Sequence, residues 1–152
     1  MYLIINEAAQ AYSGHIPADC YHQPYMPLPE LKNEMQRMTF FGWEEKGELA
    51  GVMGAEPVKG VTLLRHAYVL TAYQGKGIGS SLLKRIVEET TTPRLLVGTW
   101  ADATWAVDFY KAHGFVLVED KDTLLKTYWT IPQRQIDTSV VLERVPGSSR
   151  GR

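Results

Sequence analysis

The spacing of apolar and polar residues predicts a chain in which helices and strands alternate. Segments whose apolar residues recur at helical spacing are expected to bury one face of a helix, and they span 3–12, 30–38, 79–89, 103–113 and 122–129. Shorter runs rich in apolar residues are expected to be strands, at 39–45, 49–56, 61–70, 94–99, 115–119 and 138–144. This order is typical of an α/β domain with a central sheet.

Turn-forming residues mark the ends of these segments. The proline-rich stretch from Pro17 through Pro29 separates the first two helices, and Lys46-Gly47-Glu48 is expected to join the first two strands as a hairpin. Gly114 follows the fourth helix, where glycine commonly ends a helix. The sequence therefore predicts one domain over residues 1–145 and a flexible polar tail over 146–152.

A glycine-rich turn, Gln74-Gly75-Lys76-Gly77-Ile78-Gly79, lies between an expected strand and an expected helix. Glycines let the backbone approach an anion closely, and the following helix adds free N–H groups and the positive end of its dipole. This arrangement predicts a site for a phosphorylated ligand. A P-loop is excluded because no Lys-Ser or Lys-Thr pair follows the glycines, and a dinucleotide fingerprint would need glycine where Ser80 stands.

Two blocks of sequence resemble the GNAT superfamily of acetyl-CoA-dependent N-acetyltransferases. The segment from Ala67 to Ser80 is similar to that family's pyrophosphate-binding strand, loop and helix, with its Gln-x-x-Gly-x-Gly pattern. The segment from Ala106 to Phe115 is similar to the family's A-x-x-F-Y-x-x-x-G-F block, in which a helix carries a tyrosine and ends at glycine before a strand. Their order, and a spacing of roughly thirty residues, make the resemblance specific over about residues 39–118.

The resemblance implies an α/β fold with a GNAT-like mixed central sheet flanked by helices. Relatives usually open with a strand, whereas here a helical pattern begins almost at Met1, so the first edge strand is expected to be missing or rudimentary. Either the fold tolerates this loss, or the chain starts late, or a partner such as a second copy in a homodimer covers the edge, because an uncovered sheet edge invites pairing. The implied ligand is acetyl-CoA, as cosubstrate, and the residues expected to bind it are Val69, Leu70, Gln74, Gly75, Lys76, Gly77, Ile78, Gly79 and Ser80.

The implied activity is direct transfer of acetyl from acetyl-CoA to a primary amine of a small molecule, an amino acid or a protein. Backbone amides near Val69 and Leu70 would hold the pantetheine arm and polarise the thioester carbonyl. Tyr110, at the family's tyrosine position, would protonate the departing sulfur, although a tyrosine on an amphipathic helix can also be a core aromatic. The alternative from another functional class is a catalytically silent acyl-CoA-binding or regulatory module with the same fold.

The residue that would deprotonate the amine is left open. Relatives often carry glutamate or histidine four residues before the Val69 position, where this chain has Arg65, and arginine cannot act as a base near neutral pH. Arg65 could hold a substrate carboxylate or form a structural salt bridge. His66 could act as the base or be a buried, hydrogen-bonded histidine, and strand alternation predicts that it faces away from Arg65. Glu56 could act through water or be a solvated charge at the end of its strand.

The composition of the chain argues against several kinds of partner and ligand. Sixteen basic residues nearly balance seventeen acidic ones, so no strong field favours nucleic acid or an anionic membrane as a partner. The single Cys20 cannot form an internal disulfide, no segment resembles a signal peptide or a membrane span, and a cytoplasmic location is expected. The histidines and Cys20 do not fall at the spacing of metal ligands, so no metal is expected. The expected partner is an amine acceptor, a small molecule or a peptide, whose identity the sequence does not reveal.

Overall fold

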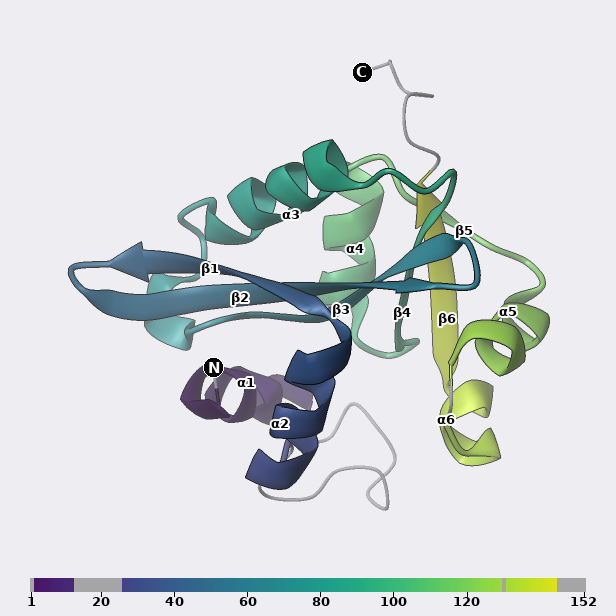
Figure 1. Ribbon diagram of the computed structural model, residues 1–152, viewed down its shortest axis with the longest axis horizontal. Helices are drawn as coiled ribbons and strands as arrows, with labels where there is room; N and C mark the ends of the chain where they lie inside the picture. Colours follow the sequence, from purple (N-terminus) through teal and green to yellow (C-terminus); the bar gives the residue numbers. More distant parts are fainter. Residues whose placement is uncertain (1, 13–25, 130, 145–152) are drawn as a thin grey trace.

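A six-stranded mixed sheet runs through the centre of the molecule (Figure 1). The computed structural model describes residues 2–12, 26–129 and 131–144. In chain order the strands are β1 (Thr39–Glu45), β2 (Glu48–Val58), β3 (Val61–Val69), β4 (Leu95–Trp100), β5 (Val116–Leu117) and β6 (Ser139–Arg144). Across the sheet their order is β1-β2-β3-β4-β6-β5, in which β3 and β4 run parallel and the other neighbours antiparallel.

Helices cover both faces of the sheet (Figure 1). One face is covered by α3 (Ile78–Glu89) and α4 (Thr104–Ala112). The other face is covered by α1 (Tyr2–Ala8), α2 (Leu28–Arg37), α5 (Lys121–Tyr128) and α6 (Gln133–Asp137). Two short 3-10 turns, η1 (Ala9–Tyr12) and η3 (Thr71–Tyr73), follow α1 and β3.

Side-chain alternation along the strands builds a core on each face. Leu64 and Leu142 pack on the side of α3 and α4, whereas their neighbours Leu63 and Val141 pack on the opposite side with α5 and α6. All of these residues are no more than 1% exposed. The central strands are therefore buried on both faces, which explains why they are apolar at consecutive positions rather than at alternate ones.

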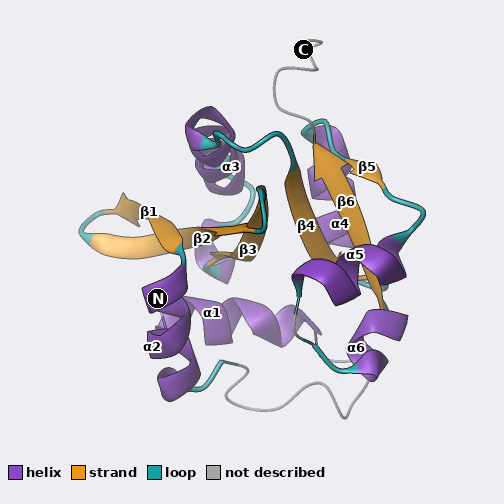
Figure 2. Cartoon of the chain, turned by 45° about the vertical axis from the view of Figure 1, so that its right-hand side comes forward, coloured by secondary structure: helices purple, strands orange, loops and turns teal. Residues whose placement is uncertain are grey.

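Strands β3 and β4 separate soon after they pair. Their parallel ladder joins residues 62–64 to residues 95–97, and beyond it the two strands diverge (Figure 2). The second half of β3 stays paired with β2, whose register with β3 shifts between Val52 and Gly54. The sheet therefore opens along one edge of β3, and the end of this strand leads through η3 into the glycine-rich turn and α3.

The structure confirms the α/β fold with a mixed central sheet flanked by helices. Each expected helix and strand is present, with ends that differ by a few residues, and no strand precedes α1 in the described part of the chain. Helix α6 was not expected, because five residues are too few to show a helical period. No described helix is long and apolar enough to cross a membrane. The expected tail at 146–152 and most of the proline-rich stretch lie outside the described residues.

Candidate active site

The glycine-rich turn forms a cradle of backbone N–H groups at the start of α3. Gly75 and Gly77 adopt φ values of +82° and +84°, which residues with a Cβ rarely adopt. The first hydrogen bond inside α3 runs from the Ser81 amide to the Gly77 carbonyl, so the amides of residues 78–80 have no partner within the helix. Gly77 is the N-cap, and no side chain caps the helix. The free amides and the helix dipole therefore favour an anion here.

Side chains around this cradle hold its ends in place. Gln74 Nε2 donates to the Val69 carbonyl over 3.1 Å and ties the turn to the end of β3. Lys76 Nζ lies 5.5 Å from the centre of the Tyr73 ring, whose hydroxyl donates to Glu48 of β2 over 3.2 Å. Gln74 therefore stabilises the turn from within, while the ammonium group of Lys76 lies over the Tyr73 ring.

The last residues of β3 direct one backbone amide into the opening between β3 and β4. The Leu70 amide donates to the Ala50 carbonyl over 2.9 Å. Because successive amides of a strand point to opposite edges, the Val69 amide points away from β2 and toward the gap. The Leu70 amide is therefore not available to a ligand, in contrast to the expectation from the sequence, whereas the Val69 amide lies where the sheet opens.

Ser80, at the start of α3, is linked to the end of α4. His113 Nδ1 donates to the Phe109 carbonyl over 2.7 Å, since a carbonyl can only accept. In a neutral imidazole Nε2 is then an acceptor, and Ser80 Oγ donates to it over 2.9 Å. The hydroxyl proton of Ser80 is thus engaged within the protein, and its backbone amide is the group left to bind an anion.

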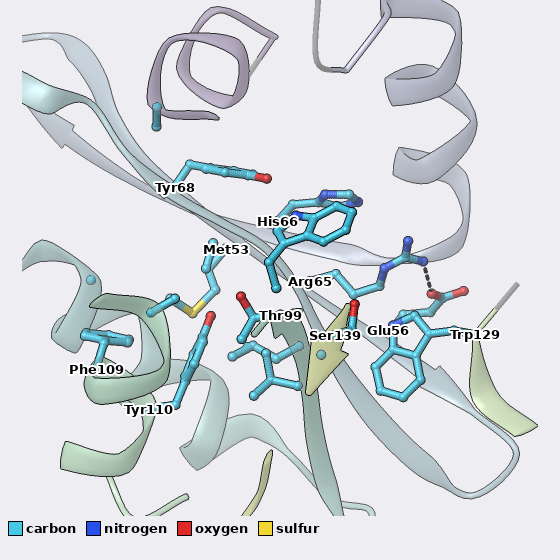
Figure 3. A pocket seen from close by; sticks show the side chains of 18 of the residues that line it. Met53, Glu56, Arg65, His66, Tyr68, Thr99, Phe109, Tyr110, Trp129 and Ser139 are labelled. Atoms are coloured by element: carbon cyan, nitrogen blue, oxygen red, sulfur yellow. Dashed lines mark hydrogen bonds and ion pairs between the residues drawn. The ribbon is translucent and has the colours of Figure 1, made fainter. Parts of the chain in front are cut away.

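Tyr110 of α4 reaches from the core to the gap. Its side chain is buried and packs edge-on against Phe109 and Phe115, at centroid distances of 5.3 and 5.5 Å. Its hydroxyl end points toward Met53 and Thr99, which line the same cleft (Figure 3). The two roles considered from the sequence are therefore compatible, because the ring is a core aromatic and the hydroxyl lies at the cleft.

One cleft of about 1330 Å³ joins the glycine-rich turn to α2. Its lining includes Tyr110 on the α3 and α4 side of the sheet, and Arg65 and His66 on the α2 side (Figure 3). Glu34 of α2 also lines it. Ligand pockets typically measure about 300–1,000 Å³, so this cleft has room for a long ligand and a second molecule. In the described residues, no group of three or more His, Cys, Asp or Glu side chains is arranged to hold a metal ion.

Arg65 and His66 lie on the same side of β3, and the prediction that they face apart is wrong. Arg65 Nη2 contacts Glu34 Oε1 at 3.2 Å, and His66 Nε2 contacts the same oxygen at 2.7 Å. The cause is a β-bulge, because Met53 alone lies opposite His66 and Ala67 in the β2–β3 register. His66 adopts a φ of +56° at this bulge, and the extra residue turns its side chain back toward α2.

Two glutamates and two arginines form a closed ring of ion pairs on the α2 side. Arg65 contacts Glu34 and, over 3.0 Å, Glu56. Arg37, one turn after Glu34 on α2, contacts the second oxygen of each carboxylate. Glu34 and Glu56 are only 6% and 8% exposed, and each is balanced by two guanidinium groups. This ion-pair ring joins α2 to β2 and β3.

The ion-pair ring favours one of the roles that the sequence left open for Arg65 and Glu56. The guanidinium of Arg65 is shared between two buried carboxylates, which is the structural salt bridge rather than a free site for a substrate carboxylate. Glu56 is buried rather than solvated, and both of its oxygens accept hydrogen bonds from arginines. Both residues therefore have a structural role in holding α2 against the sheet.

Burial determines the charge of His66. Its side chain is 13% exposed, and its ring stacks on Phe40 at a centroid distance of 6.0 Å. Desolvation, followed by the positive charge of Arg65, lowers the pKa of His66 from 6.5 to about 4, although Glu30 and Glu56 act in the opposite direction. The imidazole is therefore neutral near pH 7 and is a weak base.

Glu34 and Arg37 are the residues of this site that the sequence reasoning missed. Glu34 lies three residues after Leu31 and four before Met38, and all of these side chains are buried. It therefore occupies the apolar face of an amphipathic helix. A glutamate on such a face is a detectable signal, because a buried carboxylate needs a hydrogen-bonded or charged partner.

The chain is similar to acetyltransferases in sequence pattern and in fold. The model of the acetyltransferase (GNAT) family matches residues 4–115. A GNAT family acetyltransferase from Staphylococcus aureus Mu50 is 18% identical, with a TM-score of 0.68 over 93% of this chain and 90% of that chain. The PaiA N-acetyltransferase from Thermoplasma acidophilum, in complex with coenzyme A, is 16% identical, with a TM-score of 0.65 over 95% and 89%.

A third solved structure of similar fold contains acetyl-CoA. The GNAT family acetyltransferase from Elizabethkingia anophelis with acetyl-CoA bound is 18% identical, with a TM-score of 0.63 over 86% of this chain and 90% of that chain. No curated protein matches the sequence. At these sequence identities, the likeness to the solved structures shows a shared fold. The match to the family model shows in addition that the chain has the sequence pattern of the family.

Proposed function

Because the chain belongs to the acetyltransferase (GNAT) family, we propose that it transfers the acetyl group of acetyl-CoA to a primary amine of a small molecule, an amino acid or a protein. The observation that carries this proposal is the cleft that joins an anion cradle to the gap between β3 and β4. A thioester with its phosphates at the cradle can extend along the open edge of β3. Two solved structures of similar fold contain coenzyme A or acetyl-CoA, which supports acetyl-CoA as the ligand.

The residues of the cradle suit a pyrophosphate. The amides of residues 78–80 have no partner within α3, and Gly77 has no side chain that could cover them. Lys76 adds a cation at the edge of the turn. The Val69 amide, at the edge of β3 that faces the gap, is free to bind the carbonyl group of the ligand.

In the proposed acetyl transfer, Val69 and Tyr110 each have one role. The amine nitrogen, in its neutral form, attacks the carbonyl carbon of the thioester, and the Val69 amide donates a hydrogen bond that stabilises the negative charge developing on the carbonyl oxygen. As the carbon–sulfur bond breaks, Tyr110 donates its hydroxyl proton to the sulfur. The amine nitrogen loses one proton to solvent, and the phenolate of Tyr110 takes one proton back, so that the products are an amide and free coenzyme A.

A matched pair of glycine variants tests the cradle. A Cβ at Gly77 would meet no protein atom within 4 Å, and the same is true of Gly60 in the turn between β2 and β3, whose φ of +85° is almost identical. Gly77→Val and Gly60→Val therefore carry the same backbone strain, about 1–2 kcal/mol. We expect only Gly77→Val to weaken acetyl-CoA binding in calorimetry, by about tenfold or more. Equal affinities in the two folded variants would contradict the cradle.

Release of the free thiol of coenzyme A tests the reaction. The panel of acceptors contains spermidine, tyramine, free amino acids and a lysine-containing peptide, so that each class of primary amine is represented. We expect acetyl-CoA turnover with at least one class. Tight binding of acetyl-CoA without thiol release above the rate of hydrolysis, for every acceptor, would favour the silent acyl-CoA-binding module instead.

A further inference from the structure

One nitrogen of the His66 imidazole lacks a hydrogen-bond partner among the described residues. Nε2 contacts Glu34 Oε1 at 2.7 Å and Phe40 stacks on the ring, whereas Nδ1 makes no hydrogen bond to that part of the chain. The side chain is largely buried and lines the cleft. Buried polar atoms in native proteins are nearly always hydrogen-bonded, so an unpaired one needs an explanation.

Glu34 determines which nitrogen is unpaired. Its two oxygens contact the guanidinium groups of Arg37 and Arg65, which can only donate hydrogen bonds. Glu34 is therefore a carboxylate and an acceptor, so Nε2 of His66 must carry the imidazole proton and donate it. In the neutral ring, Nδ1 is then an unprotonated nitrogen whose lone pair can accept a hydrogen bond.

We propose that Nδ1 of His66 binds the acceptor amine by accepting one of its N–H hydrogens, and that Glu34 is the residue that positions the imidazole. This inference rests on the proposed function, because it presumes an amine substrate. His66 lies two residues beyond the last pair of β3 with β4, at the beginning of the gap, and its side chain is on the α2 side (Figure 3). The amine thus reaches the gap from the α2 side of the sheet. The cradle, at the start of α3, lies on the opposite side.

The surroundings of His66 favour an amine in its reactive form. The ion-pair ring carries no net charge, because two carboxylates are balanced by two guanidinium groups. Nδ1 is a neutral acceptor, and a hydrogen bond to it uses an N–H hydrogen of the amine and leaves the nitrogen lone pair free. Holding the amine by one hydrogen therefore restricts the directions in which its lone pair can point, which raises the fraction of productive encounters.

Nitrogen NMR tests the tautomer without any acceptor. In the protein labelled with ¹⁵N-histidine, long-range ¹H–¹⁵N correlations at pH 7.5 should show a protonated Nε2 and an unprotonated Nδ1 for His66. The signals are assigned to His66 by their absence from His66→Gln. The opposite tautomer, or a doubly protonated ring, would overturn the role of Glu34.

Two variants of His66 separate the functions of its two nitrogens. Glutamine places an amide N–H near the position of Nε2 and keeps the contact with Glu34, but it has no atom in place of Nδ1. Asparagine places an amide oxygen near the position of Nδ1, loses the contact with Glu34, and suits a positive φ. The pair therefore removes one hydrogen bond at a time.

The kinetic comparison uses the amine of the panel with the highest turnover. His66→Gln should raise the KM for that amine by about five- to tenfold, which is the contribution of one neutral hydrogen bond, and should leave the affinity for acetyl-CoA unchanged. His66→Asn should keep the KM for the amine within about threefold of the wild-type value. An unchanged KM in His66→Gln, or equal increases in both variants, would overturn the inference.

Different results would refute the amine contact of His66 and the proposed acetyl transfer. If the wild-type protein acetylates an amine and His66→Gln does so with the same KM, acetyl transfer stands and the role of Nδ1 is refuted. If no amine of the panel releases coenzyme A, the proposed function is refuted, and with it the amine contact.

Discussion

Acidification should destabilise the folded protein through His66. A histidine in the unfolded chain has a pKa near 6.5, whereas desolvation and the charge of Arg65 lower the pKa of His66 to about 4 in the folded protein. Between these two values the unfolded chain binds a proton that the folded protein does not bind. The free energy of unfolding must therefore fall as the pH falls through this window, and His66 adds no further change below about pH 4.

The expected size of this effect follows from the two pKa values. They differ by about 2.5, and a difference of one corresponds to about 1.4 kcal/mol, so unfolding should become easier by on the order of 3 kcal/mol between pH 7.5 and pH 4. Other charged groups titrate in or near the same range and must be separated from His66. Those that face it are Glu30, Glu34 and Arg37 from α2, Glu56 from β2 and Arg65 from β3.

Urea denaturation of the wild type and His66→Asn, at a series of pH values and one ionic strength, isolates the contribution. The carboxylates titrate in both proteins, so the wild-type stability minus that of the variant should fall by on the order of 3 kcal/mol from pH 7.5 to pH 4. A difference that does not depend on pH would refute the reasoning. A difference that grows on acidification would mean that the folded state holds an imidazolium against Glu34.

Three further variants have expected outcomes. Tyr110→Phe should slow turnover by about 10²- to 10⁴-fold with little change in acetyl-CoA affinity, and an unchanged single-turnover rate would refute the acid role. Ser80→Ala should lower the free energy of unfolding by about 1 kcal/mol and change acetyl-CoA affinity less than about threefold, because its hydroxyl proton bonds His113; a tenfold loss in calorimetry would contradict this. Arg65→Ala should destabilise the fold by about 3–5 kcal/mol in urea denaturation and raise KM equally for an amino acid and its decarboxylated amine, whereas a larger loss for the amino acid would restore the substrate carboxylate.

The cradle could be predicted from the sequence because its signals are local. The positive φ of Gly77, the start of α3 and the end of α4 shortly before Gly114 each follow from a glycine next to a periodic apolar segment. In each case the residues that determine the geometry lie within a few positions of one another. The location of Tyr110 at the cleft was instead expected from the resemblance to the GNAT family, because no local signal places a helical tyrosine at a cleft.

The ion-pair ring could not be predicted in this way. It brings Glu34 of α2 against Arg65 of β3, and the packing of these two elements is not encoded in either segment alone. The assumption of regular alternation then placed His66 on the wrong face. A bulge depends on the pairing of two strands, and no turn residue marks it here, since a histidine adopts the positive φ.

The bulge at His66 also explains how one strand supplies both sides of the cleft. Residues four apart on an unbroken strand share a face, yet Arg65 contacts Glu34 on the α2 side, whereas Val69 packs with the core on the α3 side. The extra residue reverses the alternation between them. A positive φ in a residue other than glycine costs about 1–2 kcal/mol, and the contact of His66 with Glu34 offsets this strain. An unbroken β3 would avoid the strain, but it would have to give up either the ion-pair ring or the packing of Val69 beside the cradle.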